Sequence, residues 1–198
     1  MGIEIPQNKF LILDGAMGTV LQQRGLSPQG RPELLNLTEP ELLDSVYKEY
    51  IAAGSQVIYA NTFGANGLKL AKTGHSVEEV VGAAIAVAKK AAAGTGTLVA
   101  LDVGPLGELL EPMGTLSFER AYDLFREMAE AGAKAGADLI VVETMTDLYE
   151  AKAALLAAKE AAHLPVFVTM SFDAGGRTFT GCTVASMART LEGLGADA

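Results

Sequence analysis

Cysteine is nearly absent from this 198-residue chain, which contains only Cys182. A lone cysteine excludes an internal disulfide framework and is typical of a protein from a reducing compartment. Residues 1–10 lack the basic segment followed by an apolar segment that marks a secretory signal. No uninterrupted apolar run approaches the roughly 18 residues that span a membrane. We therefore predict a cytoplasmic protein with no membrane partner.

Clusters of basic residues are also missing. The chain has 15 Lys and Arg against 24 Asp and Glu, which gives a formal net charge of −9. Nucleic acids and anionic membrane surfaces bind proteins through concentrated positive charge. The composition therefore predicts no nucleic-acid partner, and the acidic excess is typical of a soluble surface.

Short apolar runs that each end on a polar residue recur along the chain, beginning with FLILDGAMG at Phe10. Runs of this kind are typical of buried parallel strands, in which a polar residue appears only where the strand ends. We predict five such strands, Phe10–Leu13 and the runs beginning at Gln56, Thr97, Asp138 and Pro165. Their terminal polar residues are Asp14, Asn61, Asp102, Glu143 and Asp173.

Helix signals fill the segments between these runs. Thr38 is a predicted N-cap, because Glu41 follows three residues later and Pro40 falls in the first turn. A helix from Met17 to Arg24 is also expected. The same type of start is predicted at Ser76, Ser117, Asp147 and Thr183.

Strands that alternate with helices predict a parallel sheet with helices outside it. An open doubly wound sheet and a closed barrel both fit that description. The turn after the first run, DGAMG, lacks the GxGxxG spacing of a dinucleotide-binding open sheet. Polar residues at the end of every strand favour the barrel, whose sites form at the carboxyl ends of many strands. The predicted fold class is α/β, of the (β/α)8 TIM-barrel type.

The number of predicted strands is too small for a closed barrel, which has eight strands in about 250 residues. Residues 193–198 resemble Gly136-Ala137-Asp138, where a glycine closes a helix and a strand begins at once. We therefore expect residues 1–198 to hold the first five βα units of a barrel, ending where a sixth strand begins.

Several longer motifs together resemble the homocysteine S-methyltransferase family. They are ILDGAMGTVLQQRG, LLNLTEPELLDSVYKEYIAAGSQVIYANTFGAN, DVGPLG and ADLIVVETMTDLYEAKAAL. The resemblance is collinear and covers nearly the whole chain. It is tightest to family members that use methylcobalamin carried by another domain. It implies that residues 1–198 are the N-terminal part of a homocysteine-binding barrel.

The resemblance also implies a zinc ion that activates the homocysteine thiol as a thiolate for methylation to methionine. The family's zinc ligands are three cysteines that follow the sixth and eighth strands, and this chain contains none of those segments. The implied partners are homocysteine and the folate- and cobalamin-binding domains of a longer chain. With no metal ligand and no catalytic residue assigned here, we expect the chain alone to be inactive.

Two carboxylates are the main candidates for binding the substrate. Glu143 ends a strand, where a fixed carboxylate can make charge-assisted hydrogen bonds to an ammonium group; the alternative is a structural cap on the loop that follows. The resemblance places Asp14 in the homocysteine pocket, where the backbone of Gly15, Ala16 and Met17 can approach a carboxylate closely. The alternative is that Asp14 only holds its own turn.

Three further polar residues are expected at the same depth, either lining the pocket or supporting it: Asn61, Thr62 and Asp102. Cys182 follows the fifth strand and invites a metal assignment, but zinc sites need three or four nitrogen or sulfur ligands. The other candidates are His75 and His163, which fall at helix ends. We interpret Cys182 as a passive thiol.

Two other interpretations stay open from the sequence. The acidic strand ends could hold Mg²⁺, as in lyases of the same architecture, because hard cations prefer oxygen ligands. Alternatively, a five-stranded sheet leaves two edges unpaired, so the chain could be a non-catalytic half-barrel that associates with itself or with a partner. No lysine stands at a predicted strand end, which argues against Schiff-base chemistry.

Overall fold

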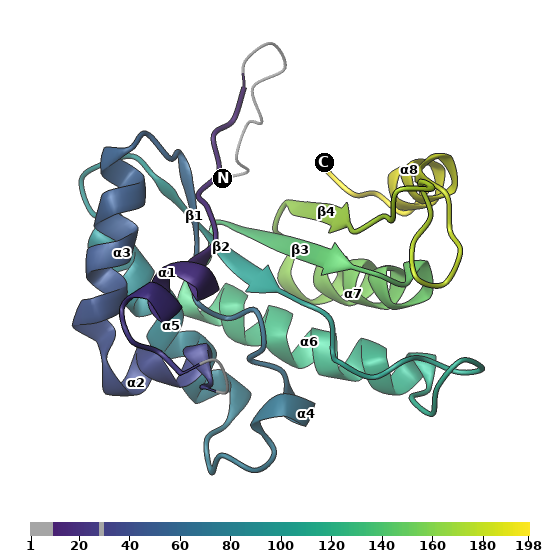
Figure 1. The fold of residues 1–198 in the computed structure, drawn as a ribbon, viewed down its shortest axis with the longest axis horizontal. Helices are drawn as coiled ribbons and strands as arrows, with labels where there is room; N and C mark the ends of the chain where they lie inside the picture. Colours follow the sequence, from purple (N-terminus) through teal and green to yellow (C-terminus); the bar gives the residue numbers. More distant parts are fainter. Residues whose placement is uncertain (1–9, 28–29) are drawn as a thin grey trace.

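The computed structural model describes residues 10–27 and 30–198 (Figure 1). Within these residues one sheet contains the strands β1 (Val57–Tyr59), β2 (Leu98–Val103), β3 (Leu139–Met145) and β4 (Val166–Met170). The helices are α1 (Met17–Gln23), the 3-10 helix η1 (Pro32–Leu34), α2 (Leu35–Thr38), α3 (Pro40–Ala52), α4 (Gly67–Leu70), α5 (Val77–Ala92), α6 (Phe118–Ala135), α7 (Leu148–Ala162) and α8 (Val184–Gly193).

The sheet is entirely parallel, and its strands lie side by side in the order of the sequence, β1-β2-β3-β4. A doubly wound sheet reverses its direction of growth at a switch point, whereas a barrel adds each strand beside the preceding one. The observed order therefore follows the barrel pattern. In Figure 1 helices α5, α6 and α7 lie along one face of this sheet.

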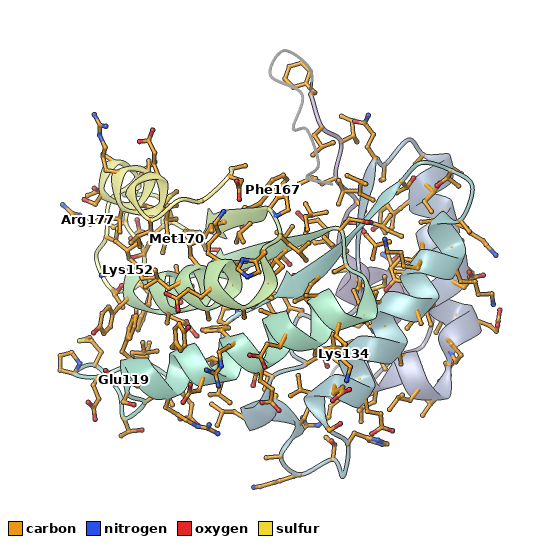
Figure 2. The ribbon with its side chains drawn as sticks, turned by 180° about the vertical axis from the view of Figure 1, so that it is seen from behind. Glu119, Lys134, Lys152, Phe167, Met170 and Arg177 are labelled. Carbon is orange, nitrogen blue, oxygen red and sulfur yellow. The ribbon has the colours of Figure 1, made fainter. Side chains whose placement is uncertain are left out.

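Both faces of the sheet are buried, as the apolar runs predicted. Side chains alternate along a strand, so Val99 and Leu101 pack toward the helices while Ala100 between them points to the other face. On that second face Ala100 joins Val141 and Phe167 in a separate apolar cluster. Phe167 lies on β4 (Figure 2). This second cluster has the position of the interior of a barrel.

The outer surface of the helices is charged. Glu119, Lys134 and Lys152 lie on α6 and α7, as Figure 2 shows in its view from behind the molecule.

In the part of the chain that the structure covers, no helix combines the length and apolarity needed to cross a membrane.

The prediction of a buried strand at Phe10–Leu13 is wrong for much of that run. Phe10 is 91% exposed and Ile12 is 50% exposed, and only Leu13 forms a bridge, with Val57 of β1. The carbonyl of Ile12 still accepts hydrogen bonds from the backbone nitrogens of Gln56 and Val57, at 2.7 and 3.2 Å. The segment therefore lies along the edge of β1, but contact on one side alone leaves half of its side chains uncovered.

Most of the predicted helix starts are confirmed. The side chains of Ser76, Ser117, Asp147 and Thr183 each accept a hydrogen bond from a backbone nitrogen in the first turn of their helix. The prediction for Thr38 is wrong. Thr38 ends α2 and its hydroxyl donates to the carbonyl of Leu34, so that Glu39 occupies the N-cap of α3 without a side-chain bond.

The last residues of the chain pair with the edge strand β4. The backbone nitrogen of Asp197 donates to the carbonyl of Val166, and that of Val168 donates to the carbonyl of Ala198, both at 2.9 Å. This is the alternating pattern by which a parallel strand joins its neighbour. Residues 197 and 198 thus lie where the sequence predicts the start of a further strand.

Candidate substrate pocket

A cavity of about 580 Å³ opens at the carboxyl ends of β1, β2 and β3, beside the turn that follows Leu13. This is the end at which barrel enzymes form their sites. The cavity brings together most of the residues predicted to bind substrate. They are Asp14, Gly15, Ala16, Met17, Asn61, Asp102 and Glu143.

Asp14 connects this pocket to the sheet. Its Oδ2 accepts a hydrogen bond of 2.8 Å from the backbone nitrogen of Tyr59, whereas its buried Oδ1 has no hydrogen-bond partner in the protein. Burial raises the pKa of Asp14 from 3.8 to about 7, and the negative charge of Glu143 adds to the effect. Asp14 therefore holds the turn through one oxygen, while its other oxygen has no partner in the protein.

Asp102 is the penultimate residue of β2 and is 7% exposed. Its Oδ1 also has no hydrogen-bond partner in the protein. Burial raises the pKa of Asp102 well above 3.8, and the charges of Glu143 and Asp14 raise it further. The side chains of Asp102 and Glu143 interact, and this interaction raises the pKa of Asp102 and opposes the rise that burial causes in the pKa of Glu143. Two carboxyl groups in one poorly solvated site disfavour the state in which both are charged.

Glu143 lies near the end of β3, where the strand is irregular. The register with β4 shifts between Val142 and Met145, and Thr144 has a left-handed φ of 58°. The backbone nitrogen of Thr144 donates to the hydroxyl of Thr169 at 3.2 Å. Such a bulge redirects the side chains beside it. Burial raises the pKa of Glu143, whose side chain is half-buried at the pocket.

The turn beside Asp14 lets the side chain of Tyr50 approach the backbone closely at Gly15. A Cβ placed on Gly15 would lie 3.0 Å from both Cε1 and Oη of Tyr50, so a side chain there would require the tyrosine ring to move. The Tyr50 hydroxyl also donates to the carbonyl of Ala16 at 3.1 Å. The small residues predicted to border the pocket therefore also let α3 pack against it.

The two polar residues after β1 differ in their roles. Asn61 lines the pocket, and its side-chain amide donates to the carbonyl of Pro32 at 2.6 Å, which holds η1 in place. Thr62 is fully buried and does not line the pocket. Its hydroxyl donates to the carbonyl of Asp102 and accepts from the nitrogen of the same residue, at 2.7 and 3.0 Å. It ties the end of β1 to β2.

Several pocket residues were not predicted from the sequence, notably Glu33, Tyr59 and Phe63. Glu33 reaches the pocket from η1, where its Oε1 accepts a hydrogen bond of 2.8 Å from the backbone nitrogen of Gly64. No pattern around Glu33 signals this, because its place depends on contact with a loop 31 residues away. Tyr59 follows directly from the strand pattern, as the last residue of β1.

Metal ligands do not gather in the described residues, where no group of three or more His, Cys, Asp or Glu could hold a metal ion. Cys182 borders a different cavity, beside Lys152 and Ser186. His75 precedes α5 and is bonded to Glu79 in the first turn of that helix at 3.0 Å. The residues described here therefore do not fit the zinc site that the resemblance implies.

The magnesium alternative gains no support from the geometry either. Asp173 is turned into its own loop, where its Oδ1 accepts hydrogen bonds from the backbone nitrogens of Gly175 and Arg177, at 2.8 and 3.0 Å. It does not line the pocket with the other acidic strand ends.

The sequence of the chain is similar to that of known proteins. A family model described as homocysteine S-methyltransferase matches residues 11–198. Methionine synthase of Mycobacterium tuberculosis (strain ATCC 25618 / H37Rv) is 30% identical over 98% of this chain, and so is methionine synthase of Mycobacterium leprae (strain TN). The chain spans only 18% of the length of either relative.

Solved structures show the same fold. The homocysteine methyltransferase MmuM from Escherichia coli, in its oxidized form, matches with a TM-score of 0.83 and 25% identity. The match covers 95% of this chain and 71% of that one. The metallated form of the same enzyme also matches with a TM-score of 0.83, at 24% identity. Together with the strand order, this likeness confirms the predicted partial (β/α)8 barrel.

Proposed function

Because this chain belongs to the homocysteine S-methyltransferase family, we propose that its pocket binds the amino-acid end of homocysteine for methyl transfer to the thiol. The observation that carries the proposal is the set of carboxylates at the ends of the strands. Asp14, Asp102 and Glu143 line one cavity, and the side chains that line it include no Lys, Arg or His. Such a pocket selects a cation.

The ammonium group of homocysteine is the cation that suits this site. It offers three N–H donors, and carboxylate oxygens without partners, such as Oδ1 of Asp14, are the acceptors it needs. Glu143 and Asp14 are half-buried, whereas Asp102 is buried, so the first two remain within reach of a ligand. We assign the ammonium to Glu143 and Asp14, with Asp102 behind them.

The carboxylate of the substrate belongs at the turn formed by Gly15, Ala16 and Met17. These residues line the same cavity as the acidic groups, and Gly15 and Ala16 are small enough to leave the backbone open to a ligand. Asn61 borders the pocket, with its amide already bonded to Pro32. This arrangement separates the two charged ends of an amino acid within one cavity.

The methyl donor is proposed to be methylcobalamin, supplied with folate by other domains of a longer protein. The proposal rests on the sequence motifs and on the relatives named methionine synthase. Zinc supplies thiol activation where it is bound, but the described residues do not hold it. The role proposed for this chain is therefore to bind and orient the amino-acid part of homocysteine.

Calorimetric titration of the chain with L-homocysteine and with 4-mercaptobutanoate, which lacks only the amino group, tests this function. We expect Glu143→Gln to weaken L-homocysteine binding by roughly 10- to 100-fold, the value of a charge-assisted hydrogen bond. Glu119→Gln, an exposed change on α6, is the matched control and should leave the affinity unchanged. Equal affinity for the two ligands would rule out the ammonium assignment.

A further inference from the structure

The pocket contains more carboxylate than a single ammonium group requires. Four acidic side chains line it, those of Asp14, Glu33, Asp102 and Glu143. Glu33 is occupied by its hydrogen bond to Gly64. The remaining three face a cavity with no cationic side chain in its lining. Three negative charges around one poorly solvated cavity repel one another, so the three carboxyl groups hold at least one proton.

The structure indicates where one proton resides. Asp102 is more than nine-tenths buried, lines the pocket and has an oxygen without a partner, and Glu143 lines the same pocket. The negative charge of Glu143 disfavours a second charge on Asp102, so the two carboxyl groups hold one proton between them. Burial raises the pKa of both groups, which favours retention of a proton by the pair.

We propose that the ligand's ammonium group displaces the proton shared by Asp102 and Glu143, so that binding of the amino acid releases a proton to the solvent. This rests on the proposed function, since it takes the ammonium as the bound cation. No covalent bond changes. The proton passes to water, and the N–H groups of the ligand then donate to the carboxylates in its place.

The other titratable groups around the pair do not supply this proton. Burial raises the pKa of Tyr47 and Tyr59 further above 10, so both stay neutral before and after binding. Asp14 titrates at about pH 7 and therefore contributes only in part. Asp14 faces the pair Asp102 and Glu143. The other titratable groups around these three carboxyl groups are Glu33 of η1, Tyr47 and Tyr50 of α3, and Tyr59 of β1.

L-Methionine is the probe that isolates this proton, because it has the ammonium and carboxylate groups of homocysteine but no thiol to titrate. Binding heats measured at pH 7 in phosphate and in Tris, which differ in ionisation enthalpy, give the number of protons released. We expect roughly one per ligand in the native chain. We expect close to none for 4-(methylthio)butanoate, which lacks the ammonium.

The pH dependence of affinity gives a second readout without any variant. Because the proton competes with the ligand, affinity for L-methionine should rise roughly tenfold from pH 6 to pH 7. Asp102→Asn should bind with a much smaller proton release, limited to the partial contribution of Asp14, and a far-ultraviolet spectrum shows whether it is folded. The native chain provides the test in either case.

The outcomes separate the two proposals. Binding of L-methionine without proton release and without pH dependence would overturn the shared-proton inference while leaving the proposed function intact. Failure of the native chain to bind L-methionine or L-homocysteine at millimolar concentration would overturn both. Proton release that persists undiminished in a folded Asp102→Asn chain would also overturn the assignment to this pair.

Discussion

Asp14 and Tyr59 are joined by a hydrogen bond of 2.8 Å, from the backbone nitrogen of Tyr59 to Oδ2 of the carboxylate. The bond attaches the turn after Leu13 to the last residue of β1. The other oxygen of the same carboxylate, Oδ1, is buried at the pocket without a partner. One side chain therefore links the fold of the N-terminal segment to the charge of the site, and changes to it should affect both.

Replacement of Asp14 by Asn should make stability less sensitive to pH. The folded protein holds the proton of Asp14 up to about pH 7, whereas the unfolded chain loses it near pH 3.8. The raised pKa thus contributes stability that is fully present below the unfolded value and is lost as the pH rises through 7. Relative to the native chain, Asp14→Asn should gain on the order of 1–3 kcal/mol between pH 4 and pH 8.

Urea unfolding of both proteins at pH 4 and pH 8 measures this difference. Asn still offers an oxygen to the nitrogen of Tyr59, so the change removes the titration and keeps the acceptor. A difference in unfolding free energy that is the same at both pH values would show that burial of Asp14 does not shift its pKa in the folded state.

Asp138 fastens β3 to the preceding βα unit. Its Oδ2 accepts hydrogen bonds from the backbone nitrogen of Val99 at 2.7 Å and from Nζ of Lys89 at 2.6 Å. Val99 is fully buried, so loss of the acceptor leaves its N–H without a partner. We expect Asp138→Ala to cost about 1–3 kcal/mol. Asp138→Asn keeps an oxygen there and should cost less.

Thermal and urea unfolding check the Asp138 prediction, with Asp123→Ala as the control because Asp123 is exposed on α6. Asp197 makes the same pair of contacts two βα units later, to Val166 and Lys159. If Asp138→Ala were as stable as Asp123→Ala, the contacts of Asp138 with Val99 and Lys89 would make no contribution to the free energy of unfolding.

The acidic part of the pocket was predictable because of strand geometry. Asp14, Asp102 and Glu143 each follow an apolar run, and parallel strands bring their carboxyl ends to one edge. The repeated pattern of apolar runs therefore predicts that these three residues lie at one edge of the sheet, without knowledge of any contact between them. The same rule left open whether Thr62 lines the pocket or supports it, because depth along a strand does not fix the direction of a side chain, and the structure shows Thr62 bonded to Asp102 of β2.

Glu33 and the first strand show what sequence patterns miss. Glu33 reaches the pocket through a bond to Gly64, a contact that depends on how η1 packs in three dimensions. Phe10 and Ile12 have the composition of a buried strand, but burial requires neighbours on both faces, and the described residues provide contact along one edge. Local apolar character predicts the tendency to be buried and leaves open whether a partner is present.

Replacement of Thr144 by Asn should stabilise the protein. Its φ of 58° lies in the left-handed region, where a β-branched residue is strained and Asn is tolerated. We expect Thr144→Asn to raise the unfolding free energy by about 0.5–1 kcal/mol, and Thr144→Val to give no gain. The bond from the nitrogen of residue 144 to Thr169 is kept in both variants. Equal stability of the two variants in urea would show that this position is not strained.

Gly104 and Phe63 should behave as a coupled pair. The backbone nitrogen of Gly104 donates to the carbonyl of Phe63 at 3.0 Å, and a Cβ on Gly104 would lie 2.5 Å from Cε2 of the Phe63 ring. Because that ring borders the pocket, Gly104→Ala should cost about 1–3 kcal/mol and also weaken ligand binding. Gly82→Ala is the matched control, since a Cβ there meets no atom within 4 Å on α5.

A double-mutant cycle separates the clash from other effects of the added methyl group. Phe63→Leu removes the ring edge that the new Cβ would strike, so the double variant should lose less stability than the sum of the single variants, by roughly 0.5–3 kcal/mol. Gly82→Ala should be neutral or stabilising, because alanine favours a helix over glycine. Urea unfolding of the four proteins gives the coupling energy. Simple additivity of the two changes would mean that the ring does not pack against Gly104, and that the wall of the pocket beside β2 is looser than the structure shows.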